Sequence, residues 1–207
     1  MARQKDEEKR IAILTAAARV IAEEGLGAPT AKIARTAKVA DGTLFVYFPN
    51  KDILFNELYL HVKRELTSRV SAAVPREADL RTQLKASWKA WTAWGVQHPA
   101  ERRALAQLAV SDRITPETRA TGLKGVEEMF ALIGMISAQG PMRQAPAMFV
   151  GAVMEAVATT TMDHMAREPG AASTICEWGF EAVWGALTAK PAPGDEARGA
   201  SRGKRKL

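Results

Sequence analysis

Apolar residues recur every three or four positions along most of the chain, and this spacing predicts helices. The first apolar stripe, in a helix expected over about 6–24, consists of Ile11, Leu14, Ala18 and Ile21. Gly25 follows, where the end of a helix favours a residue in the left-handed conformation. Because no stretch alternates apolar and polar residues over the length of a strand, we expect an all-α fold.

Capping residues and prolines divide the rest of the chain into eight further helices. We expect Thr30, Asp41 and Asn50 to cap helices over about 31–37, 41–47 and 51–72. Pro49 ends the third helix, because the residue before a proline avoids helical dihedrals. The remaining helices are expected over about 79–96, 99–110, 116–138, 145–167 and 171–189, which gives nine in all.

Composition and motifs narrow the class of protein. The single cysteine, Cys176, excludes an internal disulfide and a multi-cysteine zinc site. The charged start and the lack of a secretory leader predict a cytoplasmic protein, and no apolar run predicts a membrane span. We find no nucleophile–base pair, no Gly-rich phosphate loop and no metal-ligand spacing, so we expect no enzyme, no cofactor and no metal.

The positive charge is concentrated at the C-terminus. The net charge is +6, and residues 190–207 hold six Lys and Arg against two Asp and Glu. This segment is rich in Pro, Gly and Ala and poor in large apolar residues, so we expect a disordered basic tail. Such a tail either adds salt-sensitive attraction to nucleic acid or is solvated without a dedicated role.

The segment 39–51, VADGTLFVYFPNK, points to nucleic acid. Two short helices joined by a tight turn, with a longer helix before them, make a helix-turn-helix, whose second helix enters the major groove of DNA. Leu44 and Phe48 are four residues apart and are expected to anchor this helix to the core. Tyr47 is expected to offer its hydroxyl to a phosphate, and Lys51 stands at a helix N-terminus that favours an anion. The alternative is that all the aromatic residues here only close a small three-helix core.

Residues 10–60 resemble the N-terminal DNA-binding domain of the TetR/AcrR family of transcriptional regulators. The resemblance depends on EEG at 23–25, TAKIA at 30–34 and DGTLFVYFPNK at 41–51. It implies a helix-turn-helix domain over 1–50 and a larger helical bundle for ligand binding and dimerisation over 51–189. It further implies a homodimer that binds double-stranded DNA at a palindromic operator, most often as a repressor, and leaves it when a small apolar effector binds.

The resemblance also implies which residues contact DNA. Phosphate contacts fall on Thr30, Thr43, Tyr47 and Lys51, and the residues nearest the bases are Gly42, Leu44 and Phe45. We add Lys32, from the helix before the turn. The full set of predicted DNA-binding residues is Thr30, Lys32, Gly42, Thr43, Leu44, Phe45, Tyr47 and Lys51.

Two departures from the family pattern change the expected chemistry. Lys38 stands where the family often has glycine, so we expect a lysine in a left-handed conformation, at about 1 kcal/mol. The recognition helix also offers no Arg, Lys, Asn or Gln for bidentate base contacts, so specificity is expected to depend on apolar contacts, on residues 30–35 and on DNA shape. The alternative function is a helical small-molecule-binding protein whose N-terminal domain no longer reads DNA.

The later helices carry the candidate ligand and dimer residues. Three tryptophans at intervals of three sweep around an arc of one helix, and the resemblance implies that Met and aromatic residues of other helices face them. Together they predict an adaptable apolar pocket, although each residue taken singly could be ordinary core. The predicted ligand residues are Trp88, Trp91, Met129, Phe130, Ile133, Met154 and Glu155. The resemblance implies that the last two helices form the dimer interface, and small residues spaced by three and four along the last helix support this, although a monomer core could explain the same spacing. The predicted interface residues are Ile175, Gly179, Ala182, Val183 and Ala186.

Glu155 is the one charged residue between Arg143 and Asp163, on a helix that is otherwise apolar or hydroxyl-bearing. A buried carboxylate needs a partner. We therefore expect Glu155 either to contact a polar or cationic group of the effector or to form a hydrogen bond across the dimer interface.

Overall fold

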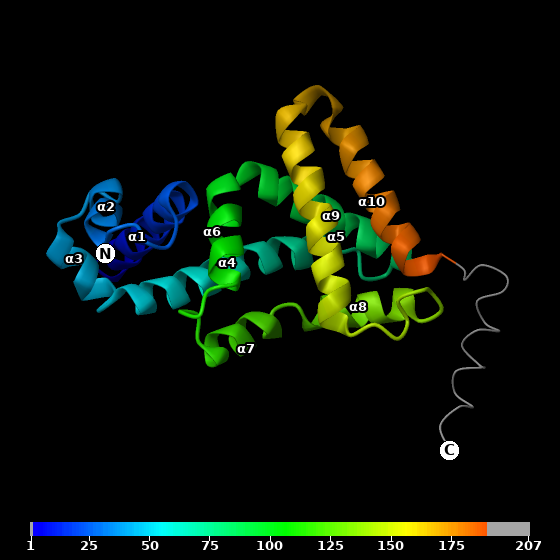
Figure 1. Cartoon of the computed structure of the whole chain (residues 1–207), viewed down its shortest axis with the longest axis horizontal. Helices are drawn as coiled ribbons and strands as arrows, with labels where there is room; N and C mark the ends of the chain where they lie inside the picture. Colours follow the sequence, from blue (N-terminus) through cyan, green and yellow to red (C-terminus); the bar gives the residue numbers. More distant parts are fainter. Residues whose placement is uncertain (1, 190–207) are drawn as a thin grey trace, which may run out of the picture. The chain divides into compact units, whose positions relative to one another are not determined.

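Helices are the regular secondary structure of the residues that are described. The computed structural model describes residues 2–189, with side chains from residue 5 onward, and this part of the chain contains no strand. The helices are α1 (Ala2–Glu24), α2 (Thr30–Thr36), α3 (Asp41–Tyr47), α4 (Lys51–Ala73), α5 (Leu80–Gln97), α6 (Pro99–Ala109), α7 (Pro116–Lys124), α8 (Glu127–Ser137), α9 (Ala147–Arg167), the 3-10 turn η1 (Pro169–Ala171) and α10 (Ala172–Thr188) (Figure 1). The predicted all-α class is confirmed, and the tail 190–207 lies outside the described residues.

The helix predicted over 116–138 is wrong, because two helices occupy this range. α7 ends at Lys124, and the amide of Val126 donates to the carbonyl of Leu123 at 3.0 Å, a tighter bond than the α-helical pattern. A Cβ on Gly125 would lie 3.3 Å from the Thr67 hydroxyl oxygen, so this break packs closely against α4. The described part of the chain therefore has ten α-helices instead of nine.

Two of the predicted helix caps are wrong. Thr30 and Asp41 are the first residues of α2 and α3, and the N-cap positions belong to Pro29 and Ala40, which have extended backbones and no side-chain cap bond. Asp41 instead places its charge in the first turn, where the helix dipole favours an acid. The cap predicted at Asn50 is confirmed, because its side-chain oxygen accepts from the Ile53 amide at 2.8 Å.

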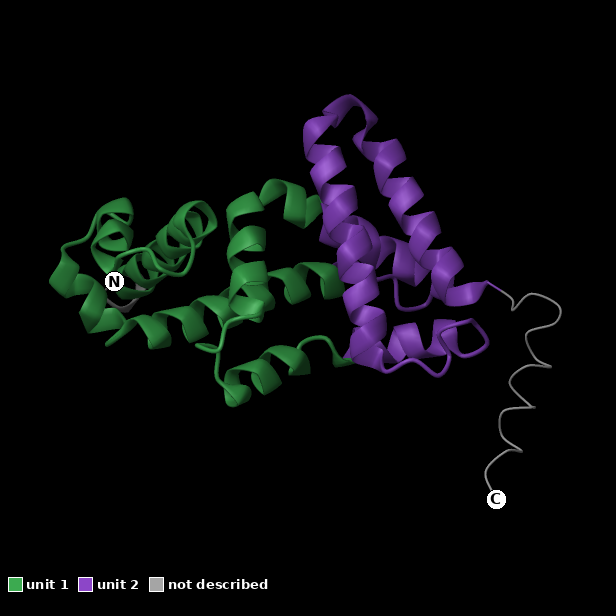
Figure 2. Cartoon of the chain, viewed as in Figure 1, with its two compact units in different colours: residues 1–72, 93–127 green, residues 73–92, 128–207 purple. Residues whose placement is uncertain are grey.

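The chain divides into two compact units (Figure 2). Unit 1 is residues 1–72 and 93–127, and unit 2 is residues 73–92 and 128–207. The predicted boundary at residue 50 separates a DNA-binding domain from a ligand-binding and dimerisation domain. Because this is a division by function and not by compactness, it stays a prediction.

The core of unit 1 gathers apolar side chains from α1 to α4 with residues of α5 and α6. Its fully buried members include Ile13, Leu14, Ile21, Ile33, Leu44, Phe48, Leu54, Phe55 and Leu58. Burying a side chain of this size contributes roughly 1.5–3 kcal/mol. The first three helices are thereby held to α4 by one continuous core, which fixes the orientation of α3.

Unit 2 is organised around the hairpin of α9 and α10, which lie side by side and are joined through η1 (Figure 1). The indole N–H of Trp88, on the first part of α5, donates to the carbonyl of Cys176 at 3.0 Å. Phe180 and Val183 of α10 and Ala158 and Met162 of α9 are buried alongside. Within the described residues, none of the helices combines the length and the apolar character that crossing a membrane requires.

Candidate nucleic-acid interface

α3 buries one face and exposes the other. Leu44 and Phe48 are each 1% exposed, so the expectation that they anchor the helix is confirmed. The same burial contradicts the placement of Leu44 near the bases, because its side chain points into the core of unit 1. Gly42 is exposed, as is Phe45 at 45%, so both are available on the surface.

Sequence reasoning missed Val46, which is 80% exposed and lies four residues after Gly42. Residues four apart share a helix face, and this spacing was the available signal. A Cβ added to Gly42 would meet nothing within 4 Å. The outward side of α3 is therefore an open strip of backbone and apolar side chain, defined by Gly42, Phe45 and Val46.

The turn between α2 and α3 has the predicted strained residue. Lys38 has a φ of 57°, the one positive value for a non-glycine residue in the described part of the chain. The Val39 amide then donates to the carbonyl of Ala34 at 3.0 Å, which closes the turn. A left-handed lysine costs about 1–2 kcal/mol, and the buried residues Ile33 and Leu44 on either side hold it there.

Tyr47 is half-buried at the end of α3, and its hydroxyl donates to Oδ1 of Asp6 on α1 at 2.7 Å. This hydrogen bond to a carboxylate raises the pKa of Tyr47 above its usual value, since the neutral phenol is the form that can donate. The predicted phosphate donor is therefore on the surface and already engaged with an acid.

Lys51, at the start of α4, donates from Nζ to the carbonyl of Ala28 at 2.6 Å. Partial burial lowers its pKa, and the nearby charge of Arg113 lowers it further. Its ammonium lies 5.5 Å from the centroid of the Phe55 ring. These contacts hold the side chain at the N-terminus of α4, beside the end of α3.

The other predicted phosphate contacts lie around the same surface. Thr30 and Thr43 are half-buried in the first turns of α2 and α3. Lys32 on α2 is half-buried and pairs with Glu24 of α1. Arg35 and Lys38 add two exposed cations near the turn. The apolar strip of α3 is thus accompanied by hydrogen-bond donors and positive charge from α2, α3 and α4.

Comparison with known proteins identifies this arrangement. Residues 13–58 match the family model described as bacterial regulatory proteins of the tetR family. A fatty acid metabolism regulator protein of Bacillus subtilis (strain 168) is 34% identical over 77 residues, which is 37% of this chain and 40% of that protein. The chain thus matches less than half the length of this curated relative.

Solved structures match over most of the chain. A candidate TetR-family transcription regulator from Shewanella sp. PV-4 is 25% identical, with a TM-score of 0.76 over 88% of this chain and 99% of that one. The TetR-like regulator LfrR from Mycobacterium smegmatis, solved with proflavine, has the same fold at 20% identity, with a TM-score of 0.64 over 88% of this chain and 99% of that one.

Residues 13–58 therefore match the DNA-binding part of the TetR family, and the chain shares the fold of a TetR-family regulator.

Three of the seven predicted ligand residues are buried in unit 2, three are half-buried and one is exposed. Trp88, Ile133 and Met154 are buried, and Trp91, Met129 and Phe130 are half-buried. Trp91 meets Trp88 edge to face, with ring centroids 6.1 Å apart. A Cβ on Gly151 would lie 3.3 Å from the Phe130 ring. Their role in holding a ligand stays a prediction.

Glu155 corrects one expectation, since its side chain is exposed. The long run of apolar and hydroxyl residues around it suggested burial, but α9 turns Glu155 away from its buried face, where Met154 and Ala158 lie. Glu155 is therefore not the buried carboxylate that motivated a ligand contact. A hydrogen bond from Glu155 to a second copy stays a prediction.

The predicted dimer residues fall on two sides of α10. Gly179 and Val183 are buried inside unit 2, where a Cβ on Gly179 would lie 2.2 Å from the Thr161 hydroxyl and 2.8 Å from the Trp88 ring. Ile175 is 9% exposed and Ala186 is half-buried, whereas Ala182 is exposed. Gly179 is thus small because its own chain packs against it.

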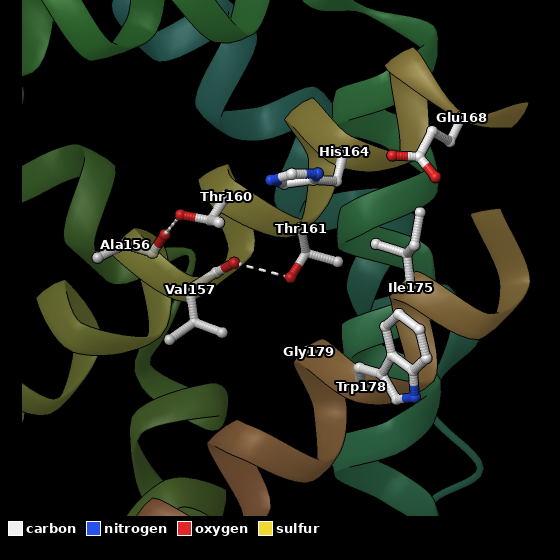
Figure 3. A pocket seen from close by; sticks show the side chains of 9 residues that line it. All are labelled: Ala156, Val157, Thr160, Thr161, His164, Glu168, Ile175, Trp178 and Gly179. Carbon is white, nitrogen blue, oxygen red and sulfur yellow. Dashed lines mark hydrogen bonds between the residues drawn. The ribbon is translucent and has the colours of Figure 1, made fainter. Parts of the chain in front are cut away.

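A shallow groove runs between α9 and α10 at the end near η1 (Figure 3). Its volume is about 590 Å³, and it is lined by Ala156, Val157, Thr160, Thr161, His164, Glu168, Ile175, Trp178 and Gly179. The threonine hydroxyls face back into α9, donating to the carbonyls of Ala156 and Val157 (Figure 3). Trp178 is 68% exposed, a large apolar side chain on an open face. None of the predicted ligand residues lines this groove.

In the described residues, no group of three or more His, Cys, Asp and Glu side chains is placed to hold a metal ion.

Proposed function

We propose that this chain is a ligand-responsive DNA-binding transcription regulator, most simply a repressor, that acts in the cytoplasm as a homodimer on a palindromic operator. The observation that carries the proposal is the exposed strip of α3, flanked by Thr43, Tyr47 and Lys51 on an otherwise buried scaffold. A major groove admits one α-helix, and hydrogen-bond donors beside that helix suit the phosphates that border the groove.

The proposed homodimer associates through the exposed face of α9 and α10. Trp178 and Ala182 of α10 and Ala156 and Thr160 of α9 are exposed on this face. A two-fold dimer presents two copies of α3, and a palindrome is read when these lie about one turn of DNA, roughly 34–36 Å, apart.

The proposed effector is small and apolar. It acts by shifting the dimer between a state whose two α3 helices match one turn of DNA and a state whose α3 helices have another spacing. A ligand that prefers a spacing other than one DNA turn weakens operator binding by its differential affinity for the two states. The relatives suggest two chemistries to test, because one is named for fatty acid metabolism and another was solved with proflavine. A long-chain acyl compound and a planar aromatic cation are therefore the first probes.

The decisive experiment measures binding to duplex DNA that flanks the gene of this protein, by gel shift at several salt concentrations. We expect Tyr47→Phe and Lys51→Ala each to weaken binding about threefold to tenfold. We expect Lys51→Ala also to lower the salt dependence by about one phosphate contact. Lys124→Ala, which removes an exposed lysine at the end of α7, is the matched control and should change little.

Two outcomes would redirect the proposal. If the protein binds neither this DNA nor any sequence selected from a random duplex pool, it is not a DNA-binding regulator. If it also binds an acyl or aromatic probe, the alternative of a small-molecule-binding protein replaces it.

A further inference from the structure

The outward face of α3 has an unusual chemistry for a helix that reads DNA. Gly42, Phe45 and Val46 form its exposed strip, and α3 (DGTLFVY) contains no Arg, Lys, Asn or Gln. Those four side chains make the common bidentate contacts to guanine and adenine in the major groove. The side chains of α3 therefore cannot recognise guanine or adenine through these bidentate hydrogen bonds.

One base feature in the major groove suits an apolar side chain, and that is the C5-methyl group of thymine. Val46 is 80% exposed, so two methyl groups stand free in the DNA-free chain, and Phe45 adds an aromatic ring at 45% exposure. Covering a methyl group with either side chain removes apolar surface from water on both partners.

The space around the strip favours close contact. An added Cβ at Gly42 would meet nothing within 4 Å, so the helix backbone is open one turn before Val46. Leu44 and Phe48 fix the opposite face of α3 in the core, at 1% exposure each, so the helix cannot rotate to offer other side chains. Gly42, Phe45 and Val46 are therefore the side of α3 that faces the bases.

The charges near the strip favour nucleic acid as its occupant over another apolar protein surface. Arg35, Lys38 and Lys51 bring three cations from α2, the turn and α4, and Thr43 and Tyr47 bring hydroxyl groups. These cations and hydroxyl groups suit the regularly spaced phosphates of a duplex, whereas a purely apolar protein surface would leave them unpaired.

Resting on the proposed function, we propose that Val46, with Phe45, determines operator specificity by contacting thymine methyl groups. Each half-site has at least one thymine under α3 whose methyl group contributes to affinity. Asp41, the one acidic side chain on α3, offers the competing mode, since a carboxylate accepts from the amino group of cytosine.

The test removes the methyl group from the DNA and the side chain from the protein. The full-length protein first selects its preferred duplex from a random pool. Each thymine of the selected half-site is then replaced by deoxyuracil, which lacks only the C5-methyl group, and affinities are compared by gel shift. We expect at least one such replacement to weaken binding by about fourfold, the effect of one buried methyl group.

The matching protein change is Val46→Ala. It should weaken binding by a similar factor, and it should make the affinity insensitive to the same uracil replacement. Because Val46 is exposed and alanine favours a helix, folding is expected to be unaffected. Val110→Ala, at a position that is 84% exposed in the C-cap of α6, is the control and should keep full sensitivity to uracil.

Each outcome separates this inference from the proposed function. Selection of no sequence at all contradicts the proposed function. Tight binding that tolerates uracil at every position, or an unchanged uracil effect in Val46→Ala, overturns the inference and leaves the regulator in place. A selected cytosine whose effect disappears in Asp41→Asn would overturn it in favour of readout by the carboxylate.

Discussion

A single hydrogen bond at the edge of the proposed DNA surface joins Tyr47 to Asp6. The phenol has one proton to donate, so a phosphate oxygen that binds Tyr47 must take it from the carboxylate. Asp6 would then be a negative charge close to another negative charge. The guanidinium carbon of Arg10, one turn further along α1, lies 5.6 Å from the centroid of the Phe48 ring. The start of α1 therefore packs beside the end of α3.

We expect Asp6→Asn to lower the pKa of Tyr47 toward its usual value of 10.0, because the carboxylate that favours the protonated phenol is gone. In the unchanged protein, the hydrogen bond from Tyr47 to Asp6 stabilises the fold fully at pH values below the usual tyrosine pKa. This stabilisation is lost as the pH rises through the higher pKa that Tyr47 has in the folded state. With only two tyrosines in the chain, carbon-13 labelled tyrosine separates the two titrations by NMR, and Tyr47→Phe assigns them.

The same variant is also expected to bind DNA about threefold to tenfold more tightly, since a repelling charge is removed. Glu8→Gln removes an equal charge from another side of α1 and is the control. A weaker complex with Asp6→Asn would mean that the carboxylate positions the hydroxyl for the phosphate instead of competing with it.

At the scale of the element, α10 approaches its neighbours closely because position 179 has no side chain. The two groups nearest to Gly179 are both held in place. The Thr161 hydroxyl donates to the Val157 carbonyl at 2.8 Å, and the Trp88 indole donates to the Cys176 carbonyl at 3.0 Å. An added methyl group therefore has no compliant neighbour to displace.

We expect Gly179→Ala to reduce the free energy of unfolding by about 1–3 kcal/mol, as overpacking does in a filled core. Gly134→Ala on α8, where an added Cβ meets nothing within 4 Å, should instead raise it by about 0.5–1 kcal/mol through the better helix propensity of alanine. Urea unfolding curves measure both values. Equal effects of the two changes would show that α10 can move away from α9 and α5.

Helix positions were predictable from the sequence to the extent that they depend on local chemistry. The 3.6-residue periodicity, Gly25 and Asn50 predicted most of the ends of the first four helices. The left-handed Lys38 was predicted from the resemblance to a family that often has glycine at this position. The break between α7 and α8 was missed because it depends on the packing of Gly125 against Thr67, which is far away in sequence.

The direction in which a side chain faces was harder to predict. A stripe of small residues looks the same whether it meets a second copy or its own chain, so the burial of Gly179 could not be read from spacing. Glu155 was misplaced for a similar reason, because an apolar neighbourhood in sequence does not say which side of α9 is covered. On α3 the i, i+4 pair Leu44 and Phe48 settled the buried face, and the same rule would have found Val46.

At the scale of the molecule, a regulator that reads a palindrome depends on association as much as on its reading helix. Trp178 is the largest side chain exposed on the face of α9 and α10, and Ala182, one turn later, leaves room beside it. Covering this ring with a second copy would contribute a large share of the association energy, as buried tryptophans commonly do.

We expect Trp178→Glu to convert the proposed dimer into a monomer at micromolar concentration and to weaken operator binding in parallel. Analytical ultracentrifugation measures the first effect and gel shift the second. Val110→Glu, at an even more exposed apolar position, is the control that should leave association unchanged. A Trp178→Glu protein that remains dimeric would place the interface elsewhere.

The distribution of the indole rings also gives the molecule a built-in optical signal. The five tryptophans lie at positions 88, 91, 94, 178 and 184, so the helix-turn-helix contains none. Trp88 and Trp94 are buried, whereas Trp178 is largely open to solvent. Emission from Trp178 is therefore expected at longer wavelength and within reach of soluble quenchers. A blue shift of this emission on concentrating the protein would report that a second copy covers Trp178. The helix-turn-helix, which has no tryptophan, would not contribute to the signal.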